Sequence, residues 1–92
     1  MKKVLIIIPT FNEIDNIGSL IRLIFSIHKN SNILVVDDNS PDKTSRLVKS
    51  LQVQFKENLF LLNRPIKQGL GKAYIDGFKW GLEKDYNYFI QM

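Results

Sequence analysis

The sequence has no cysteine, a single histidine and no long apolar run. The missing cysteines exclude disulfides and thiolate metal sites, and the lone His28 excludes a multi-histidine metal site. The longest apolar run near the N-terminus, residues 4–8, is far too short to span a bilayer, and no signal-peptide cleavage pattern follows it. We therefore expect the chain to begin in the cytoplasm and His28 to have a structural role.

Long blocks of like charge are also absent. The 92 residues carry 13 lysines and arginines against 9 aspartates and glutamates, a net charge of +4. The basic residues are dispersed, so solvated surfaces are a better interpretation than a nucleic-acid-binding tail. Hydrophobic residues make up 45% of the chain, as in globular proteins. We expect one small domain with no nucleic-acid partner.

Four apolar segments alternate with three segments of helical periodicity. We expect strands over 3–8, where Pro9 ends the first strand, and over 32–37, 59–62 and 87–92, with helices over 14–28, from residue 40 onward and over 70–84. Units of this kind, each about 30 residues long, are typical of parallel sheets with right-handed crossovers. The predicted fold class is α/β, in the order βαβαβαβ, with a mostly parallel four-stranded sheet and the fourth strand at an edge.

Local signals suggest how the helices begin and pack. Residues 10–13 match a capping box, in which Thr10 and Glu13 satisfy the first helical N–H groups. Ser40, Pro41 and Asp42 form a typical start for the second helix. The third helix has small residues every four positions, which predicts close packing on the sheet: Ala73, Gly77 and Gly81.

Three loops are expected at the carboxyl ends of the first three strands, where parallel sheets bind ligands. They span residues 9–13, 37–42 and 63–71. Their carboxylates can accept hydrogen bonds from ribose hydroxyls or base N–H groups, or bind a metal. Phe11 offers a ring against which a base can pack, and Arg64 and Lys67 can pair with phosphate. The sequence therefore predicts a nucleotide site at this edge.

Structural interpretations of the same residues stay open. Asp38 and Asp42 could shape a turn, Glu13 could serve only as a capping acid, and Phe11 could be core. Other nucleotide folds fit poorly: no Gly-x-Gly-x-x-Gly follows the first strand, no Walker A sequence is present, and a receiver domain has its acid pair after the first strand.

The motifs resemble those of a known family. The sequence is similar to inverting GT-A glycosyltransferases of family 2, and within them to dolichyl- or polyprenyl-phosphate mannosyltransferases. The residues that carry this resemblance are 9–13, 35–42, 64–65, 69–74 and 77–78. The resemblance covers essentially the whole chain and implies a Rossmann-like GT-A nucleotide-binding half, truncated. Residues 1–92 would be the incomplete N-terminal nucleotide-sugar-binding part of the family 2 domain.

The resemblance also implies binding residues. Those that line the nucleotide-sugar would be Pro9, Phe11, Glu13, Val36 and Asp38, and those that support the pocket would be Asp37, Arg64, Gly69 and Gly71. The family usually has tyrosine where this chain has Phe11, so any hydrogen bond of that hydroxyl is lost while the ring can still pack on a base.

The implied reaction moves mannose from GDP-mannose to dolichyl or polyprenyl phosphate with inversion, assisted by Mg²⁺ or Mn²⁺. The metal-binding Asp-x-Asp motif is expected just beyond Met92, so this chain would hold no metal, no catalytic residue can be named, and it would lack activity alone. The complete enzyme would be cytoplasmic or peripheral on the cytoplasmic face of a membrane, touching that surface through parts outside this chain. The alternatives are a family 2 transferase that uses UDP-glucose or another donor, and a non-catalytic fragment or interaction module.

Overall fold

A parallel sheet with helices on both faces forms the protein, whose computed structural model describes residues 3–92. Strands and helices alternate along the chain in the predicted order: β1 (Val4–Thr10), α1 (Ile17–Ile27), β2 (Asn32–Asp37), α2 (Thr44–Gln52), β3 (Leu59–Asn63), α3 (Leu70–Glu83) and β4 (Tyr88–Gln91). The predicted α/β class is confirmed.

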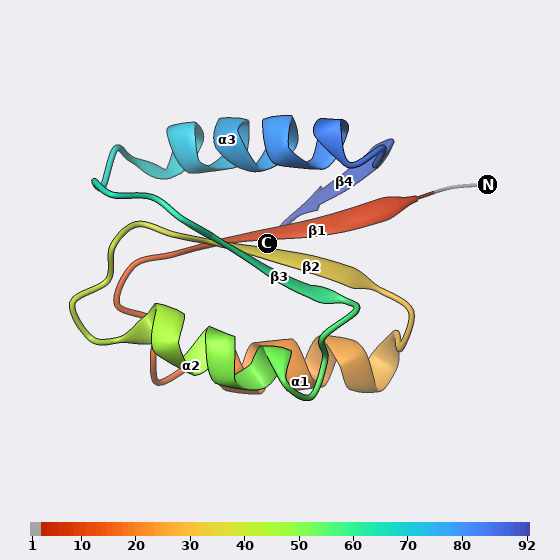
Figure 1. Ribbon diagram of the computed structural model, residues 1–92, viewed down its shortest axis with the longest axis horizontal. Coiled ribbons are helices and arrows are strands. Elements are labelled where there is room, and N and C mark those ends of the chain that lie inside the picture. Colours follow the sequence, from red (N-terminus) through yellow and green to blue (C-terminus); the bar gives the residue numbers. More distant parts are fainter. Residues whose placement is uncertain (1–2) are drawn as a thin grey trace.

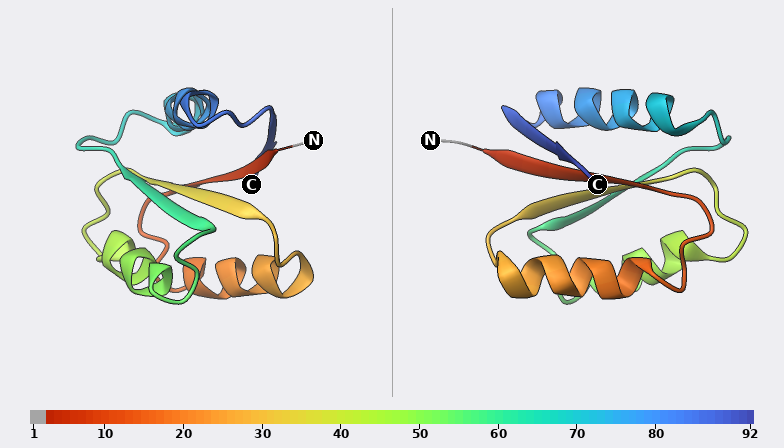
Figure 2. Two further views of the ribbon diagram at one scale, coloured as in Figure 1. Left: turned by 45° about the vertical axis from the view of Figure 1, so that its right-hand side comes forward. Right: turned by 180° about the vertical axis from the view of Figure 1, so that it is seen from behind.

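The four strands lie in the order β3-β2-β1-β4, and each neighbouring pair is parallel. Helices α1 and α2 cover one face of the sheet, and α3 covers the other (Figures 1 and 2). The chain moves from β1 outward to β3 and then returns to the far side of β1 as β4. The strand order therefore reverses beside β1, and such a reversal is where open α/β sheets form ligand crevices.

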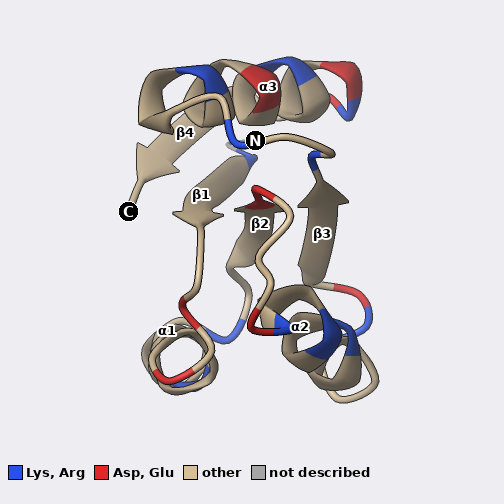
Figure 3. Ribbon diagram, turned by 90° about the vertical axis from the view of Figure 1, so that its left-hand side faces the viewer, with Lys and Arg blue, Asp and Glu red and all other residues tan. Residues whose placement is uncertain are grey.

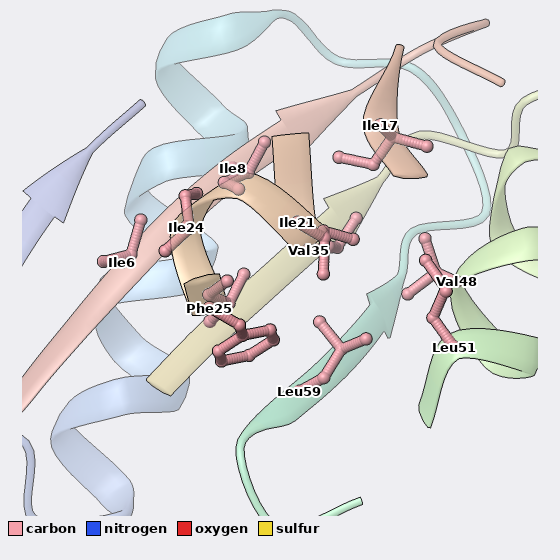
Figure 4. Packing of buried hydrophobic residues seen from close by; sticks show 11 residues of the cluster. Ile6, Ile8, Ile17, Ile21, Ile24, Phe25, Val35, Val48, Leu51 and Leu59 are labelled. Atoms are coloured by element: carbon pink, nitrogen blue, oxygen red, sulfur yellow. The ribbon is translucent and has the colours of Figure 1, made fainter. Parts of the chain in front are cut away.

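Successive side chains of each strand point to opposite faces of the sheet, so the core is divided into two clusters, one on each face. Ile6 and Ile8 of β1 face α1 and α2, where the cluster also includes Ile17, Ile21, Ile24, Phe25, Ile33, Val35, Val48, Leu51 and Leu59 (Figure 4). Leu5 and Ile7 face α3, together with Leu34, Val36, Ala73 and Tyr86. Both central strands are thus buried on both faces, which explains their continuous apolar sequences.

Small residues let α3 approach the sheet closely, as the sequence predicts. Ala73, Gly77 and Gly81 are its buried residues. A Cβ atom on Gly77 would lie 2.9 Å from Ile7 Cγ2, and one on Gly81 would overlap the ring of Phe89. The helix could not occupy this position with larger side chains.

The prediction that Pro9 ends the first strand is wrong, because β1 continues through Pro9 to Thr10. The carbonyl of Ile7 accepts the Met92 N–H, so the polar groups of Ile7 face β4. Pro9 lies two residues further and faces the same side, past the last β1–β4 partner pair, Ile7↔Gln91. Its missing N–H costs no ladder hydrogen bond there.

The predicted helix starts are also wrong. Helix α1 begins at Ile17 and α2 at Thr44, and the N-cap residues, Asn16 and Lys43, make no side-chain capping hydrogen bond. Thr10 and Ser40 instead donate their hydroxyl hydrogens to Asp37. The polar side chains chosen as caps connect loops to one another.

Strand β4 lies at an edge of the sheet, as predicted, and its Ile90 and the following Met92 are exposed. Across residues 3–92, every helix is too short or too polar to cross a bilayer.

Candidate functional site

The loops after β1, β2 and β3 meet at the carboxyl edge of the sheet. Seen from this edge, an acidic segment follows β2 and a basic segment follows β3 (Figure 3). A cavity of about 300 Å³ lies between the loops and the start of α3, lined by Pro9, Thr10, Phe11, Glu13, Asp38, Lys67, Gly69, Leu70 and Ala73. This edge is where the strand order predicts a ligand.

A larger hollow of about 500 Å³ lies at the opposite end of β1. Its charged lining residues, Lys3, His28 and Lys29, are all exposed. The smaller cavity is the better candidate because it contains a buried carboxylate, that of Asp38. A buried charge lining a concave surface is characteristic of a binding site.

Asp37 ties the ends of β1 and β2 together beneath the cavity. Its Oδ1 accepts hydrogen bonds from the hydroxyls of Thr10 at 2.7 Å and Ser40 at 2.6 Å, and its Oδ2 accepts the Ser40 N–H at 3.0 Å. The side chain is 1% exposed and both oxygens are occupied. Asp37 therefore supports the loops and has little capacity left for a ligand.

Asp38 is buried in the cavity lining and forms an ion pair with Arg64. The Arg64 Nε lies 3.0 Å from Asp38 Oδ1, but the contact lacks hydrogen-bond geometry, and this oxygen has no hydrogen-bond partner. The guanidinium also lies 3.6 Å from Asp76 Oδ2 of α3 and donates to Gln68. Arg64 thus compensates the charge of Asp38, whose Oδ1 is enclosed by protein without a hydrogen-bond partner.

The first loop is latched to the second by backbone N–H groups. Asn12 donates to the Ser40 hydroxyl at 2.9 Å, Glu13 to that of Thr44 at 3.1 Å, and Ile14 to Asp42 Oδ2 at 3.1 Å. Asn12 has a φ of 56°, in the left-handed region that asparagine tolerates. The latch holds the backbone of Phe11 and Glu13 in place at the cavity.

Asp42 carries the electrostatics of this latch. Burial raises the pKa of its carboxyl group, but hydrogen bonds from the Thr44 hydroxyl and from the N–H groups of Ile14 and Thr44 together lower that pKa by more. The net pKa therefore lies below the ordinary 3.8. The hydrogen bonds favour the charged form. Asp42 is therefore ionised at neutral pH and accepts from both loops.

Phe11 is half-buried, and a cation lies over its ring. The Lys67 Nζ is 4.1 Å from the ring centroid. The two side chains come from the first and third loops and both line the cavity. The aromatic face therefore points toward the space where a ligand would lie.

The structure brings most of the candidate residues together. Pro9, Phe11, Glu13, Asp38 and Gly69 share the cavity lining, and Asp37 and Arg64 lie behind it. Val36 is fully buried under α3, and Gly71 is exposed on the first turn of that helix. Sequence reasoning missed Thr10, Leu70 and Ala73 as lining residues, although the position of Leu70 and Ala73 after the glycine-rich loop was a usable signal.

The acids at this edge do not form a metal site. Within residues 3–92, no three His, Cys, Asp or Glu side chains are placed to hold an ion together. Asp37 already accepts three hydrogen bonds from hydroxyl and amide donors, and Asp38 is paired with Arg64. The carboxylate oxygens at this edge therefore suit hydrogen-bond donors of a ligand, such as hydroxyl and base N–H groups, better than a divalent cation.

Known proteins resemble this chain closely. It is 37% identical over 91 residues to the polyprenol monophosphomannose synthase of Mycolicibacterium smegmatis. The alignment covers 99% of this chain and 34% of that protein. It is 40% identical over 90 residues to the undecaprenyl-phosphate mannosyltransferase of Micrococcus luteus, covering 98% and 37%. The chain therefore spans about a third of the length of these relatives.

A solved structure shares the fold. The mannosyltransferase PcManGT from Pyrobaculum calidifontis, in complex with GDP-Man and Mn²⁺, matches 85% of this chain and 24% of its own with a TM-score of 0.78 and 23% identity. The model of the glycosyl transferase family 2 matches residues 5–90, nearly the whole sequence. Together with the named relatives, this match shows that the chain belongs to glycosyl transferase family 2.

Proposed function

We propose that residues 1–92 are the nucleotide-sugar-binding part of a mannosyltransferase that uses GDP-mannose and a polyprenyl phosphate acceptor. The observation that carries the proposal is the cavity in which Phe11, Glu13 and Asp38 converge from two loops at the carboxyl edge of the sheet. The names of the relatives support the acceptor and the sugar, and the GDP-Man bound to the structural neighbour supports the donor.

Each residue has a defined task in this proposal. Phe11 stacks on the base, an interaction that an aromatic ring makes with any base. Asp38 accepts a base N–H, with Arg64 compensating its charge, and Glu13 accepts a ribose hydroxyl beside Pro9. Asp37 holds the loops, and Gly69 and Gly71 leave room at the start of α3. Val36 supports the pocket from below.

In the complete enzyme, an acceptor phosphate oxygen bonds to the anomeric carbon of mannose as its bond to GDP breaks, which inverts that centre. A bound Mg²⁺ or Mn²⁺ supplies charge neutralisation for the departing diphosphate. Because the described residues do not suit such an ion, we assign the metal and the acceptor lipid to other parts of the enzyme. We place the enzyme at a membrane surface, since its acceptor is a lipid.

A titration of the chain followed by amide NMR shifts tests the donor assignment. GDP and GDP-mannose should move the signals of Phe11, Glu13 and Asp38, and Asp38→Asn should weaken this binding by about tenfold because a charged acceptor becomes a neutral one. A stronger response to UDP or UDP-glucose would instead favour a uridine donor. The absence of shifts with any nucleotide at millimolar concentration would reject the proposal and favour an interaction module.

A further inference from the structure

Lys67 lies where a bound base has to go. Its ammonium is 4.1 Å from the centroid of the Phe11 ring, over the face on which a base could stack. Both side chains line the cavity, so a base that stacks on this face of Phe11 would displace the ammonium. Lys67 must therefore move when a base binds.

The movement is easy, and it ends at the rim of the base. An exposed cation over a ring is a weak contact, whereas base–aromatic stacking is stronger. The displaced ammonium remains tethered by its four-carbon stem to the third loop, so it stays near the edge of the stacked base. It carries three donors and no acceptor.

We propose that Lys67 is a specificity-determining residue that selects a base with a carbonyl oxygen at its edge. This inference rests on the proposed function, because it needs a nucleotide in this cavity. Guanine presents O6 and N7 as acceptors along one edge, whereas adenine replaces O6 with an amino donor. The ammonium attracts the first arrangement and opposes the second.

The buried carboxylate reinforces the selection. Asp38 is 6% exposed, and its Oδ1 has no hydrogen-bond partner although Arg64 compensates its charge. Asp38 and Lys67 both line the cavity, so a carboxylate and a cationic donor are available to the same base. Guanine has N–H groups next to its O6, so it satisfies both, whereas adenine has no carbonyl oxygen for Lys67. A donor–acceptor pair of this kind rejects a mismatched base more strongly than shape does.

The test compares dissociation constants of GDP, inosine diphosphate and ADP for the full 92-residue chain, measured by NMR titration. Lys67→Met should weaken GDP and inosine diphosphate binding by about tenfold, because both bases carry O6, and leave ADP binding within about twofold. Lys79→Met, at an exposed lysine of α3 outside the cavity lining, is the matched control and should change none of the three.

Two outcomes would overturn the inference and leave the proposed function intact. Equal weakening of GDP and ADP would place the ammonium on a phosphate or ribose, and unchanged or tighter GDP binding would make Lys67 only a cover for Phe11. Phe11→Leu should weaken all three nucleotides by a similar factor, because stacking is tolerant of base identity. If the wild-type chain binds no nucleotide at all, the proposed function fails, and this inference with it.

Discussion

The carboxyl edge of the sheet and the β4 side of the molecule are held together by different kinds of side-chain contact. At the carboxyl edge, hydroxyl and carboxylate groups from three loops bond to one another around Asp37, Asp38 and Asp42. Beside β4, packing relies on close apolar contact under α3, and Ile90 and Met92 are exposed on the other face. Side-chain polar groups thus fix the geometry of the candidate site, whereas backbone pairing with β1 and apolar packing under α3 position the edge strand.

Breaking the buried ion pair should have the largest effect on this comparison. Arg64→Met leaves the Asp38 and Asp76 carboxylates without their shared cation, and we expect a loss of about 3–5 kcal/mol in the free energy of unfolding. Urea denaturation measures the loss. Arg64→Lys keeps a charge and should lose less, so equal losses for the two variants would show that packing, and not charge, is the contribution of Arg64.

On the β4 side, a larger side chain under α3 should be the most damaging change. Gly81→Val places branched carbons against the Phe89 ring and Leu5, and the strain should cost about 1–3 kcal/mol. Gly71→Val is the matched control, because a Cβ at Gly71 has nothing within 4 Å. Thermal unfolding followed by circular dichroism compares them. Equal stability of the two variants would contradict the close approach of α3.

At the carboxyl edge, Thr10→Val keeps the shape of the side chain and removes the hydroxyl that donates to Asp37. The buried Asp37 Oδ1 then loses one of its two donors, and we expect a loss of about 1–2 kcal/mol. Chemical denaturation gives the value. Amide shifts of Phe11 and Glu13 should also change, since the first loop is anchored there. A stable variant with an unmoved first loop would mean that the remaining Ser40 contacts hold Asp37 alone.

Acidification should loosen the latch between the first two loops. The Asp42 pKa is lowered in the folded state, so ionised Asp42 stabilises the fold above its ordinary pKa of 3.8, and this contribution is lost as the pH falls through the lowered value. Asp42→Asn should be less stable than wild type at pH 6, and the gap should narrow below about pH 4. Melting temperatures across this range check it. A gap that stays constant with pH would exclude the carboxylate charge as its cause.

The smallest effect on stability is expected from the exposed edge. Ile90→Ser should change the free energy of unfolding by no more than about 0.5 kcal/mol, because the side chain is 47% exposed. The same change should reduce self-association, since apolar edge strands pair with other chains. Sedimentation at increasing concentration measures this. If the wild-type chain stays monomeric at high concentration, the expected difference in self-association between the two chains is absent and the prediction is wrong.

The fold could be predicted well from the sequence because its signals are strong. Continuous apolar runs in β1 and β2 indicate strands buried on both faces, and the small residues of α3 indicate close packing. The starts of α1 and α2 could not be predicted, because Thr10 and Ser40 have hydroxyls that serve equally as helix caps or as partners of a distant carboxylate. Pro9 in β1 was missed for a similar reason: whether its missing N–H matters depends on which strand lies beside it.

The candidate site shows the same division. Glu13, Asp38 and Phe11 could be named from motif and position after each strand, and their place in one cavity follows from the parallel sheet. The pairing of Arg64 with Asp38 and Asp76, and the position of Lys67 over Phe11, join residues of different loops. No local pattern encodes such contacts.

The sequence by itself determined the order of elements, the parallel sheet and the family, because these depend on periodicity and on motifs that lie within single segments. The tertiary structure decided which polar groups face one another at the carboxyl edge, since a hydroxyl or a carboxylate takes whichever partner the sheet brings within hydrogen-bond distance. Thr10 thus became a partner of Asp37, Arg64 the counterion of Asp38, and Lys67 the cation over Phe11.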